Sequence, residues 1–599
     1  MKVKLINQPD ECYSALYQVL YNRGIININK YLETNDKDIN EPELLGEELL
    51  KRGAKMLIKH ISNKDPILVV VDADCDGYTS SALLLNYLYD LFPDFTKEKV
   101  DYYLHLKKQH GLSDCIKECF KYKMILLPDS SSNDETYHKE LAAAGIDVLV
   151  LDHHDADVDP LAYQNACIIN NQLSEYPNKE LSGVGVTWQF CRYLDKILNK
   201  DYANNYLDLV ALGDSADMMD ARSLETKALL FKGFKEENIK NPFIVNMIEK
   251  NNFSLNKADY KPSTDNKLEI TPMGASFFIT PFLNAITRSG EIEEKDIVFS
   301  SMLKYKAFEE VLSTKRGHKL GEKERIIDQA LRICTNVKNR QTKRQTEGME
   351  LLKSNIEKYN MMDNKVLLFL LEEESIDRGI LGLVANKIMA EYQRPVAILV
   401  KSKGENEKLV YSGSARGYGG IDFKSICHAA RGCVLAEGHP NAFGLAIQTD
   451  KASIAAFIQD TNELLKDLSD EPSYFVDYVW DFNNVDKVKI LDIANMNDYW
   501  GQGIERSLVY IKNIPITKDN FYIMKGNTLK YRLPSFVDII QFKGTDEEID
   551  YFSSGQNIKI NAVCKCCLNE WNGNINPQLI MEDYDIVKEE KNILNAWGF

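Results

Sequence analysis

The pattern of hydrophobic and polar positions changes several times along the chain, and each change marks a predicted structural unit. Residues 1–62 mix charged and apolar positions in a helix-like pattern. From residue 63 to 298, short β-branched runs alternate with helix-like segments. Continuous apolar runs, each followed by a helix, are typical of parallel strands buried on both faces. This region therefore predicts an α/β domain.

The second half of the chain predicts three further units. Residues 299–360 are charged and mainly helical in pattern, which is typical of a connector between domains. Residues 361–470 return to alternating strands and helices, so we expect a second α/β domain there. From 471 to 599 short strands alternate with turns, a spacing that predicts a small β-barrel.

Composition narrows the class of protein without indicating a function. Hydrophobic residues make up 44% and charged residues 27% of the 599 positions, which is ordinary for a soluble chain of several domains. No apolar run reaches membrane-spanning length, and the first 20 residues lack the features of a signal peptide. We therefore expect a cytoplasmic protein without membrane contact. Its twelve cysteines, including the cluster Cys564, Cys566 and Cys567, are expected to be reduced thiols rather than zinc ligands.

The distribution of charge does not decide whether the protein binds nucleic acid. The net charge of -17 argues against a general affinity for polyanions. Residues 301–360 differ, because they carry 14 lysines and arginines against 8 aspartates and glutamates. A solvated helix face explains this local excess as well as a nucleic-acid surface does, so charge alone does not decide between them.

Acidic side chains and histidines form four groups in the first α/β region, three of them directly after apolar runs. The groups are Asp72, Asp74 and Asp76; Asp129; Asp152, His153 and His154; and Asp214, Asp217 and Asp220. In open α/β sheets ligands bind beyond the carboxyl ends of the strands. A single aspartate at a strand end is more often a helix cap, but four such groups on successive elements favour a functional site.

The residue types in these groups suit a particular chemistry. Carboxylates with one or two imidazoles are typical ligands of Mn²⁺ or Mg²⁺ rather than of zinc, since thiolates are lacking. Two such ions, about 3.5–4 Å apart, can clamp a phosphodiester on its attacking and leaving oxygens. We expect Asp129 to be the bridging carboxylate. The residues alone thus predict a two-metal phosphoester hydrolase.

Taken in order, these motifs resemble those of the DHH phosphoesterase superfamily, and within it the RecJ family. The four motifs are "DADCDG", an aspartate at a strand end, "DHH" and "GDSAD". Further on, "DRGILGLVANKI", "GSARG" and "AEGHPNAFGLAI" are similar to the DHH-associated domain, and "NEWNGNINPQL" to an oligonucleotide-binding (OB) barrel. The resemblance covers nearly the whole chain. It implies a parallel-sheet DHH domain, an α/β DHH-associated domain joined to it by a helical connector, and a C-terminal OB-fold.

The resemblance implies a role for each matching residue. The two metal ions, Mn²⁺ or Mg²⁺, would be bound by Asp74, Asp76, Asp129, His153 and Asp217, with Asp72 as a further candidate. Asp129 and His154 would be catalytic, with His154 contacting the scissile phosphate or the leaving oxygen. The substrate would be bound by four residues: Ser414, Arg416 and His439 would hold its phosphates, and Arg288 would support the nucleic-acid path near the domain junction. The planar fork of an arginine matches phosphate oxygens.

The implied function is a single-stranded-DNA-specific exonuclease that works 5′ to 3′ and releases 5′-mononucleotides in recombination and repair. Stacking residues in the barrel would be Tyr510, Tyr522, Tyr531 and Trp571, each of which can equally be barrel core. Two alternatives stay open: a phosphodiesterase for short oligonucleotides or cyclic dinucleotides, and a non-catalytic single-strand-binding scaffold. We expect a monomer, with RNA as a second candidate substrate and a helicase or single-strand-binding protein as a candidate partner.

The chain also departs from the family pattern. Val71 replaces a usual His or Gly, Asp214 a usual Thr, and Glu437 a usual Gly. The loop after Asp129 reads "SSSND". In "HLKKQHGLS" an arginine of the family is absent, and Lys107, Lys108 and His110 are its candidate replacements. These differences leave rate and substrate preference open, and they suggest a divergent branch such as a phage or plasmid copy.

Overall fold

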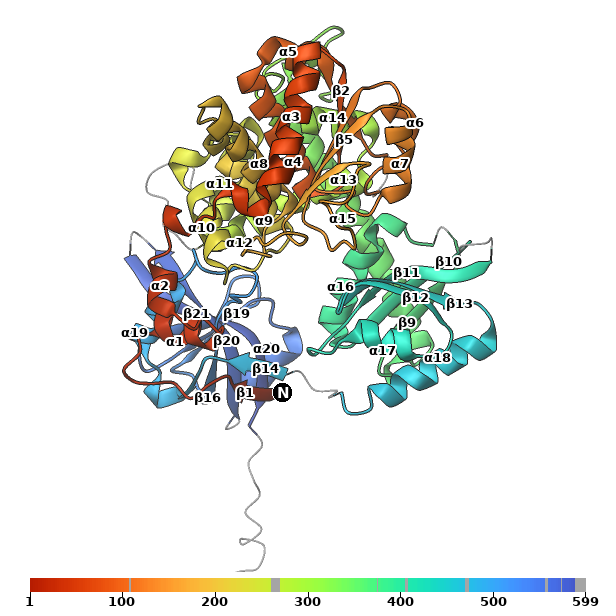
Figure 1. Ribbon diagram of the computed structural model, residues 1–599. Helices are drawn as coiled ribbons and strands as arrows, with labels where there is room; N and C mark the ends of the chain where they lie inside the picture. The colour runs from red at the N-terminus through yellow and green to blue at the C-terminus, as the bar shows by residue number, and fades with distance from the viewer. Residues whose placement is uncertain are drawn as a thin grey trace, which may run out of the picture.

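The chain folds into three lobes (Figure 1). This computed structural model describes residues 1–106, 109–259, 270–373, 375–403, 408–468, 473–554, 558–571 and 574–587. One lobe holds the first α/β region, the second holds the other α/β region, and the third holds the C-terminal β-rich region. The predicted fold class is therefore confirmed. None of the described helices has the length and apolar composition that a membrane span requires.

The first α/β domain is built on a five-stranded parallel sheet. Its strands lie in the order β3 (Val100–Leu104), β2 (Ile67–Val71), β4 (Met124–Pro128), β5 (Asp147–Asp152) and β6 (Cys167–Asn170). Every residue of β2 and β4 is buried, which explains their uninterrupted apolar sequences. The chain goes from β2 to β3 on one side and then crosses to β4 on the other. Ligands of open parallel sheets bind at such a reversal, here between β2 and β4.

Three helices surround the carboxyl edge of this sheet. Helix α4 (Cys75–Leu91) starts directly after β2, and its N-cap Asp74 accepts a hydrogen bond of 3.0 Å from the Gly77 amide. Helices α8 (Gly183–Leu198) and α9 (Leu207–Ala216) pack against α4 and against each other. The N-terminus of α8 and the C-terminus of α9 therefore meet the start of α4, where the acidic residues lie.

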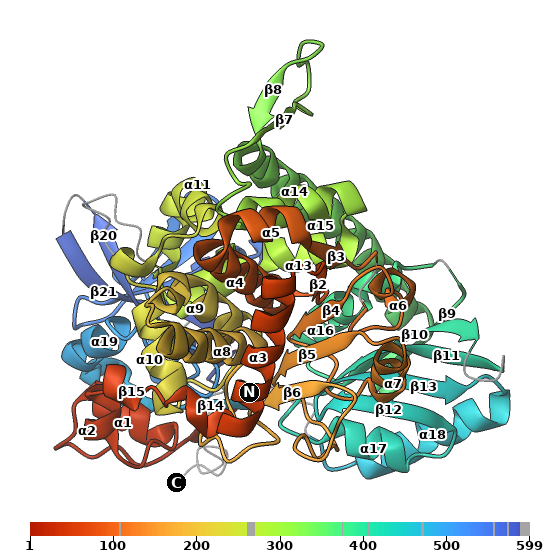
Figure 2. The same ribbon diagram turned by 45° about the horizontal axis from the view of Figure 1, so that its top comes forward.

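The region between the two α/β domains contains a hairpin and a long helix. Strands β7 (Glu310–Leu312) and β8 (Lys323–Arg325) pair antiparallel and project from the molecule (Figure 2). Helix α15 (Ile326–Lys358) packs on α13 (Thr280–Ser289) and α14 (Ile292–Met302), and reaches α16 (Leu381–Tyr392) of the second α/β domain. The helical pattern of the connector thus belongs to α15, whereas residues 310–325 form the hairpin.

The second α/β domain and the barrel are each built on one sheet. The second domain has the order β12 (Cys433–His439), β13 (Ala442–Gln448), β11 (Leu409–Arg416), β10 (Val396–Lys403) and β9 (Leu367–Leu371). The seven-stranded barrel sheet has the order β15 (Tyr478–Asp481), β16 (Leu508–Ile516), β20 (Ile558–Trp571), β21 (Asn574–Ile586), β19 (Asp538–Gln541), β18 (Thr528–Arg532) and β17 (Phe521–Met524).

The first residues of the chain pack on the last domain. Strand β1 (Lys2–Leu5) pairs in parallel with β14 (Ser473–Val476), which leads into the barrel. Arg23, the C-cap of α1 (Ala15–Asn22), donates hydrogen bonds of 2.9 and 3.0 Å to the fully buried carboxylate of Asp477. Helix α3 (Glu47–Asn63) instead packs on the first α/β domain. Residues 1–62 therefore connect these two lobes.

Candidate metal centre and substrate cavity

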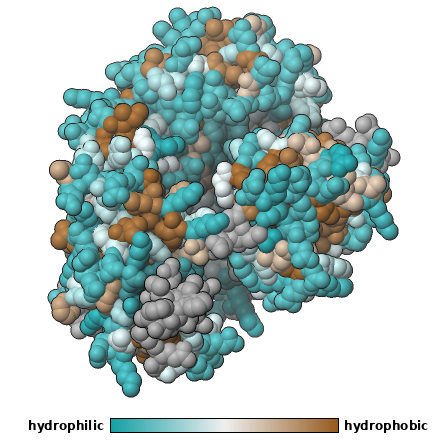
Figure 3. All heavy atoms as spheres, turned by 90° about the horizontal axis from the view of Figure 1, so that it is seen from below, coloured by the Kyte–Doolittle hydropathy of each residue, from teal (hydrophilic) through white to brown (hydrophobic). Residues whose placement is uncertain are grey.

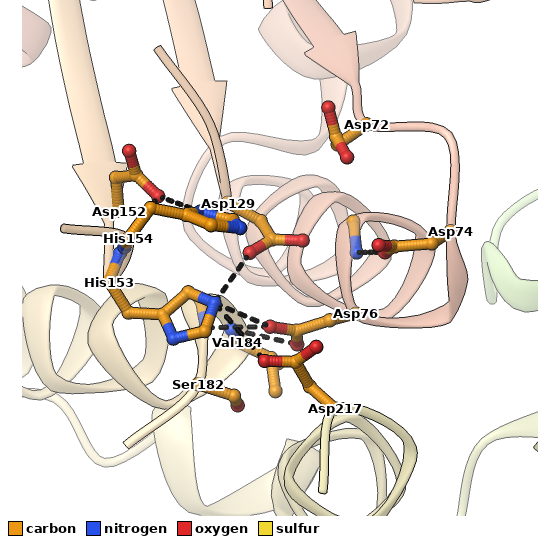
Figure 4. Close-up of polar contacts among 12 residues, drawn as sticks. Asp72, Asp74, Asp76, Asp129, Asp152, His153, His154, Ser182, Val184 and Asp217 are labelled. Atoms are coloured by element: carbon orange, nitrogen blue, oxygen red, sulfur yellow. Dashed lines mark hydrogen bonds and ion pairs between the residues drawn. The ribbon is translucent and has the colours of Figure 1, made fainter. Parts of the chain in front are cut away.

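The carboxyl ends of β2, β4 and β5 bring the predicted ligands together around His153 (Figure 4). The Nε2 atom of His153 lies 3.3 Å from an oxygen of Asp129, 3.4 Å from one of Asp217 and 3.9 Å from one of Asp76. Asp217 reaches this point because it is the C-cap of α9. Three carboxylates from three different elements thus surround one imidazole nitrogen.

A second group of ligand atoms lies on the other side of Asp129. Asp72, Asp74 and His110 place one ligand atom each within 4.8 Å of one another. In Figure 4 the Asp129 carboxylate is drawn between His153 and the pair Asp72 and Asp74. Asp129 is therefore placed where a carboxylate could serve both groups.

The cluster is electrostatically unfavourable without a cation. Burial, followed by the negative charge of Asp76, raises the pKa of Asp129 well above its usual range. Burial and neighbouring aspartates likewise raise the pKa of Asp76 to about 7 and the pKa of Asp217 to about 8. Buried carboxylates that repel one another hold protons unless an opposite charge is nearby. A divalent cation would supply that charge.

Buried polar atoms lead to the same conclusion. Among the described residues, Asp72 Oδ1, Asp129 Oδ1 and His153 Nε2 have no hydrogen-bond partner, although the last two lie only 3.3 Å apart. Unpaired buried polar atoms are uncommon in folded proteins and call for an explanation. Metal ligation would satisfy all three atoms. The residues present therefore fit a centre of oxygen and imidazole ligands, as expected for Mn²⁺ or Mg²⁺.

Close helix packing holds these carboxylates in place. Both oxygens of Asp76 accept hydrogen bonds from the first amides of α8, at 2.7 Å from Gly183 and 3.1 Å from Val184. A helix N-terminus favours a negative charge in this position. The approach requires glycine, because a Cβ on Gly183 would lie 2.3 Å from an Asp129 oxygen and one on Gly213 would lie 2.4 Å from an Asp76 oxygen.

His154 has an environment different from that of His153. Its Nδ1 lies 2.8 Å from Asp152 Oδ1, and this hydrogen bond raises the pKa of His154 to about 9. Asp152 also accepts a bond of 3.0 Å from the Ser132 amide. The His154 side chain is 53% exposed, so its other nitrogen is accessible. The imidazolium form is therefore favoured at neutral pH and suits contact with a phosphate or a leaving oxygen.

Three aspartates of the four sequence groups lie outside the ligand clusters found in the described chain, and two of them support the site. Asp152 orients His154. Asp214 accepts hydrogen bonds from the Ser182 hydroxyl at 2.7 Å and the Ser182 amide at 3.3 Å, and so fixes the start of α8. Asp220 instead forms an ion pair with Arg222. The unusual Asp214 therefore acts on the site through α8.

A cavity of about 810 Å³ between α13 and the second α/β domain contains most of the predicted substrate residues. Arg288, Ser414 and Arg416 line it, together with Arg378. Burial lowers the pKa of Arg416, and the charge of Arg288, which lines the same cavity, lowers it further. The cavity adjoins the acidic cluster, because α13, which carries Arg288, packs on α4, whose N-cap is Asp74. The charge of Asp74 accordingly opposes the lowering of the pKa of Arg288 by burial. Seen from below, the surface is hollowed near its centre and mainly hydrophilic around the hollow (Figure 3).

The remaining sequence predictions have varied placements. His439 is exposed at the end of β12 and is not among the described residues that line the cavity. In the barrel Tyr531 is fully buried and Tyr510 is 9% exposed, so both are core, whereas Tyr522 is 39% exposed. The Trp571 side chain, Lys107 and Lys108 lie outside the described residues. Cys564, Cys566 and Cys567 are free and buried.

Sequence reasoning missed two residues near the site. Arg378 lies in the motif "DRGILGLVANKI", but nothing in the sequence indicated that it would line the cavity. Asp134 accepts hydrogen bonds of 2.9 Å from both the Leu112 amide and the Ser131 hydroxyl, and so joins two loops beside the acidic cluster. The unusual loop after Asp129 was the only sequence signal for it.

A parallel sheet whose strands end in this acidic and histidine cluster, facing a cavity in a second α/β domain, defines a DHH-type protein. Family models agree: the DHH family N-terminal domain matches residues 66–213, the DHHA1 domain 363–467 and the RecJ OB domain 476–583. The chain belongs to the DHH family and has the domain set of its RecJ members.

Individual relatives agree with this assignment. YorK of Bacillus phage SPbeta, described as a candidate single-strand DNA-specific exonuclease, is 32% identical over 99% of each chain. The single-stranded-DNA-specific exonuclease RecJ of Bacillus subtilis is 24% identical over 97% of this chain and 69% of its own length. The crystal structure of RecJ with Mn²⁺ from Thermus thermophilus has the same fold, with a TM-score of 0.69 at 17% identity, and covers 98% of this chain and 80% of the RecJ chain.

Proposed function

We propose that this protein is a metal-dependent exonuclease that hydrolyses single-stranded DNA from the 5′ end. The observation on which this rests is the ligand cluster around His153 and Asp129, beside a cavity lined by the guanidinium groups of Arg288 and Arg416. An acidic centre that fits divalent ions, next to cationic side chains, suits a phosphodiester as substrate. Polarity and the release of 5′-mononucleotides are supported by membership of the family.

The protein's own residues have separable tasks in this reaction. Arg288, Arg416 and Ser414 bind and orient the phosphates of the strand in the cavity. His154, held as a cation by Asp152, contacts the scissile phosphate and can give its proton to the leaving oxygen. The residues that would hold two Mn²⁺ or Mg²⁺ ions are Asp74, Asp76, Asp129, His153 and Asp217, with Asp72. Bound ions would activate water and neutralise charge on the phosphate.

The C-terminal barrel favours a long strand as substrate. Its match to the RecJ OB domain supports an extended surface for single strands, which such folds bind through backbone charge and stacking. A phosphodiesterase for dinucleotides would not need such an extended surface. A non-catalytic scaffold would not need the acidic cluster. RNA as a second substrate, a helicase or single-strand-binding partner, a monomeric state and a cytoplasmic location stay predictions.

The first experiment uses one single-stranded oligonucleotide, labelled at either end, with Mn²⁺ or with EDTA. We expect a 5′ label to appear at once as a mononucleotide, and a 3′ label to pass through a shrinking ladder, only when Mn²⁺ is present. Asp129→Ala should abolish cleavage and leave strand binding largely intact. The matched control is Asp220→Asn, because Asp220 lies in the same motif region but pairs with Arg222. Hydrolysis of dinucleotides without cleavage of the long strand would contradict the proposal.

A further inference from the structure

The loop that carries His110 places an imidazole nitrogen in the acidic cluster, and no role in metal binding has so far been given to this nitrogen. The Nδ1 atom of His110 lies 2.6 Å from Asp72 Oδ2, and one ligand atom from each of His110, Asp72 and Asp74 falls within 4.8 Å of the others. Asp72 is completely buried, and its second oxygen has no hydrogen-bond partner among the described residues. The His110 side chain is 49% exposed. It therefore lies between solvent and the buried Asp72 carboxylate, beside the partly exposed Asp74.

This loop is anchored on both sides of His110. After it, the Leu112 amide donates to Asp134 Oδ2 at 2.9 Å, and the Ser131 hydroxyl donates to the same oxygen. Before it, the buried ammonium of Lys295 binds the carbonyls of His105 at 2.7 Å and Leu106 at 3.0 Å. These contacts fix the backbone on either side of His110, and the ring itself is hydrogen-bonded to Asp72.

Two of the segments that differ from the family pattern therefore contact each other in the folded protein. His110 stands in the segment where the family's arginine is absent, and Ser131 and Asp134 belong to the unusual loop after Asp129. The second loop holds the first through Asp134. A paired change of this kind is expected when one loop supplies a functional side chain and the other fixes its position.

We propose that His110 is a nitrogen ligand of the divalent ion held by Asp72 and Asp74, and that this ligand makes the site prefer Mn²⁺ to Mg²⁺. The proposal rests on the metal-dependent function proposed above. Mg²⁺ binds almost entirely through oxygen ligands and water, whereas imidazole is a good ligand for transition metals. A histidine beside two carboxylates therefore adds affinity for Mn²⁺ and little for Mg²⁺. Asp134 is a positioning residue in this arrangement.

The test measures metal binding to the full-length, metal-free protein, by calorimetry and by the EPR signal of free Mn²⁺. In His110→Ala we expect one class of Mn²⁺ sites to weaken by about tenfold or more, while Mg²⁺ affinity changes by less than roughly threefold. His318→Ala is the control, because His318 lies in the projecting hairpin loop, where its ring hydrogen-bonds to the Lys315 carbonyl. Equal losses for both ions, or none, would overturn the proposal.

A spectroscopic measurement separates ligation from orientation of Asp72. In His153→Gln, pulsed EPR of bound Mn²⁺ should still show a ¹⁴N coupling, which should disappear when His110→Ala is added. A coupling that is unchanged between the single and double variants, or is absent from the single one, would rule out His110 as the ligand. Asp134→Ala should shift the Mn²⁺ affinity in the same direction as His110→Ala, and Asp134→Asn should restore part of it. Neither measurement requires a substrate, so failure of the His110 proposal can be distinguished from failure of the nuclease proposal.

Discussion

A single methyl group at the start of α8 should inactivate the metal centre. Gly183 faces Asp129 so closely that an added Cβ would lie 2.3 Å from Asp129 Oδ1 and 2.5 Å from its Cβ. Carbon contacts are comfortable only at about 3.5–4 Å. In Gly183→Ala the Asp129 side chain or the helix must therefore move by about 1 Å or more. Asp129 cannot adjust easily, because its φ of 69° is left-handed and its amide is bound to the Leu151 carbonyl at 2.8 Å.

The size of the effect follows from this displacement. A misplacement of about 1 Å in a catalytic group can cost roughly 10²-fold in rate, so we expect kcat to fall by about that factor or more. The assay is the initial rate of nucleotide release with Mn²⁺, together with bound metal and the unfolding temperature.

Gly348→Ala provides the matched control for this prediction. Gly348 lies inside α15, and an added Cβ would meet nothing nearer than 3.5 Å. This variant should retain full activity and unfold at the same or a higher temperature. If Gly183→Ala also keeps full activity and normal metal content, the position of the Asp129 carboxylate does not control the reaction.

Two further predictions concern protons. Asp152→Asn removes the carboxylate that raises the pKa of His154 to about 9, so the alkaline limb of the pH–rate profile should move to lower pH; an unchanged limb would separate His154 from the rate. The pKa values of Asp76 and Asp217 in the folded protein, about 7 and 8, are above those of unfolded carboxylates. The folded state then binds more protons than the unfolded state, so with EDTA the free energy of unfolding should decrease from pH 5 to 8. Mn²⁺ should remove this decrease. If thermal unfolding shows the same dependence of stability on pH with EDTA and with Mn²⁺, the prediction is wrong.

The sequence could predict those parts of the fold whose signal is local. Strands β2, β4 and β5 are buried on both faces, so their apolar runs stand out and the aspartates after them mark the sheet edge. The hairpin of β7 and β8 has no such signal, because its residues are mostly polar and exposed. The pairing of β1 with β14 depends on residues far apart in the chain, which no local pattern reveals.

The sequence could predict which residue types form the site, but not which way each side chain points. Asp129 and Asp152 both end apolar strands, yet only Asp129 faces the His153 cluster, while Asp152 turns to His154. Likewise Tyr531 is fully buried and Tyr522 partly exposed on neighbouring strands. Such differences depend on backbone turns and strand register, which are set by tertiary packing.

The attachment of the first residues to the barrel has a consequence for how the protein is made. Arg23 precedes its buried partner Asp477 by 454 positions, which corresponds to roughly half a minute or more of translation. Throughout that time β1 and α1 leave the ribosome without the surface that covers them. The same dependence limits dissection of the enzyme, because removing only the barrel would uncover the face of α1 that packs on α19 (Lys487–Ala494) and leave Arg23 without Asp477. A stable catalytic fragment must therefore be shortened at both ends.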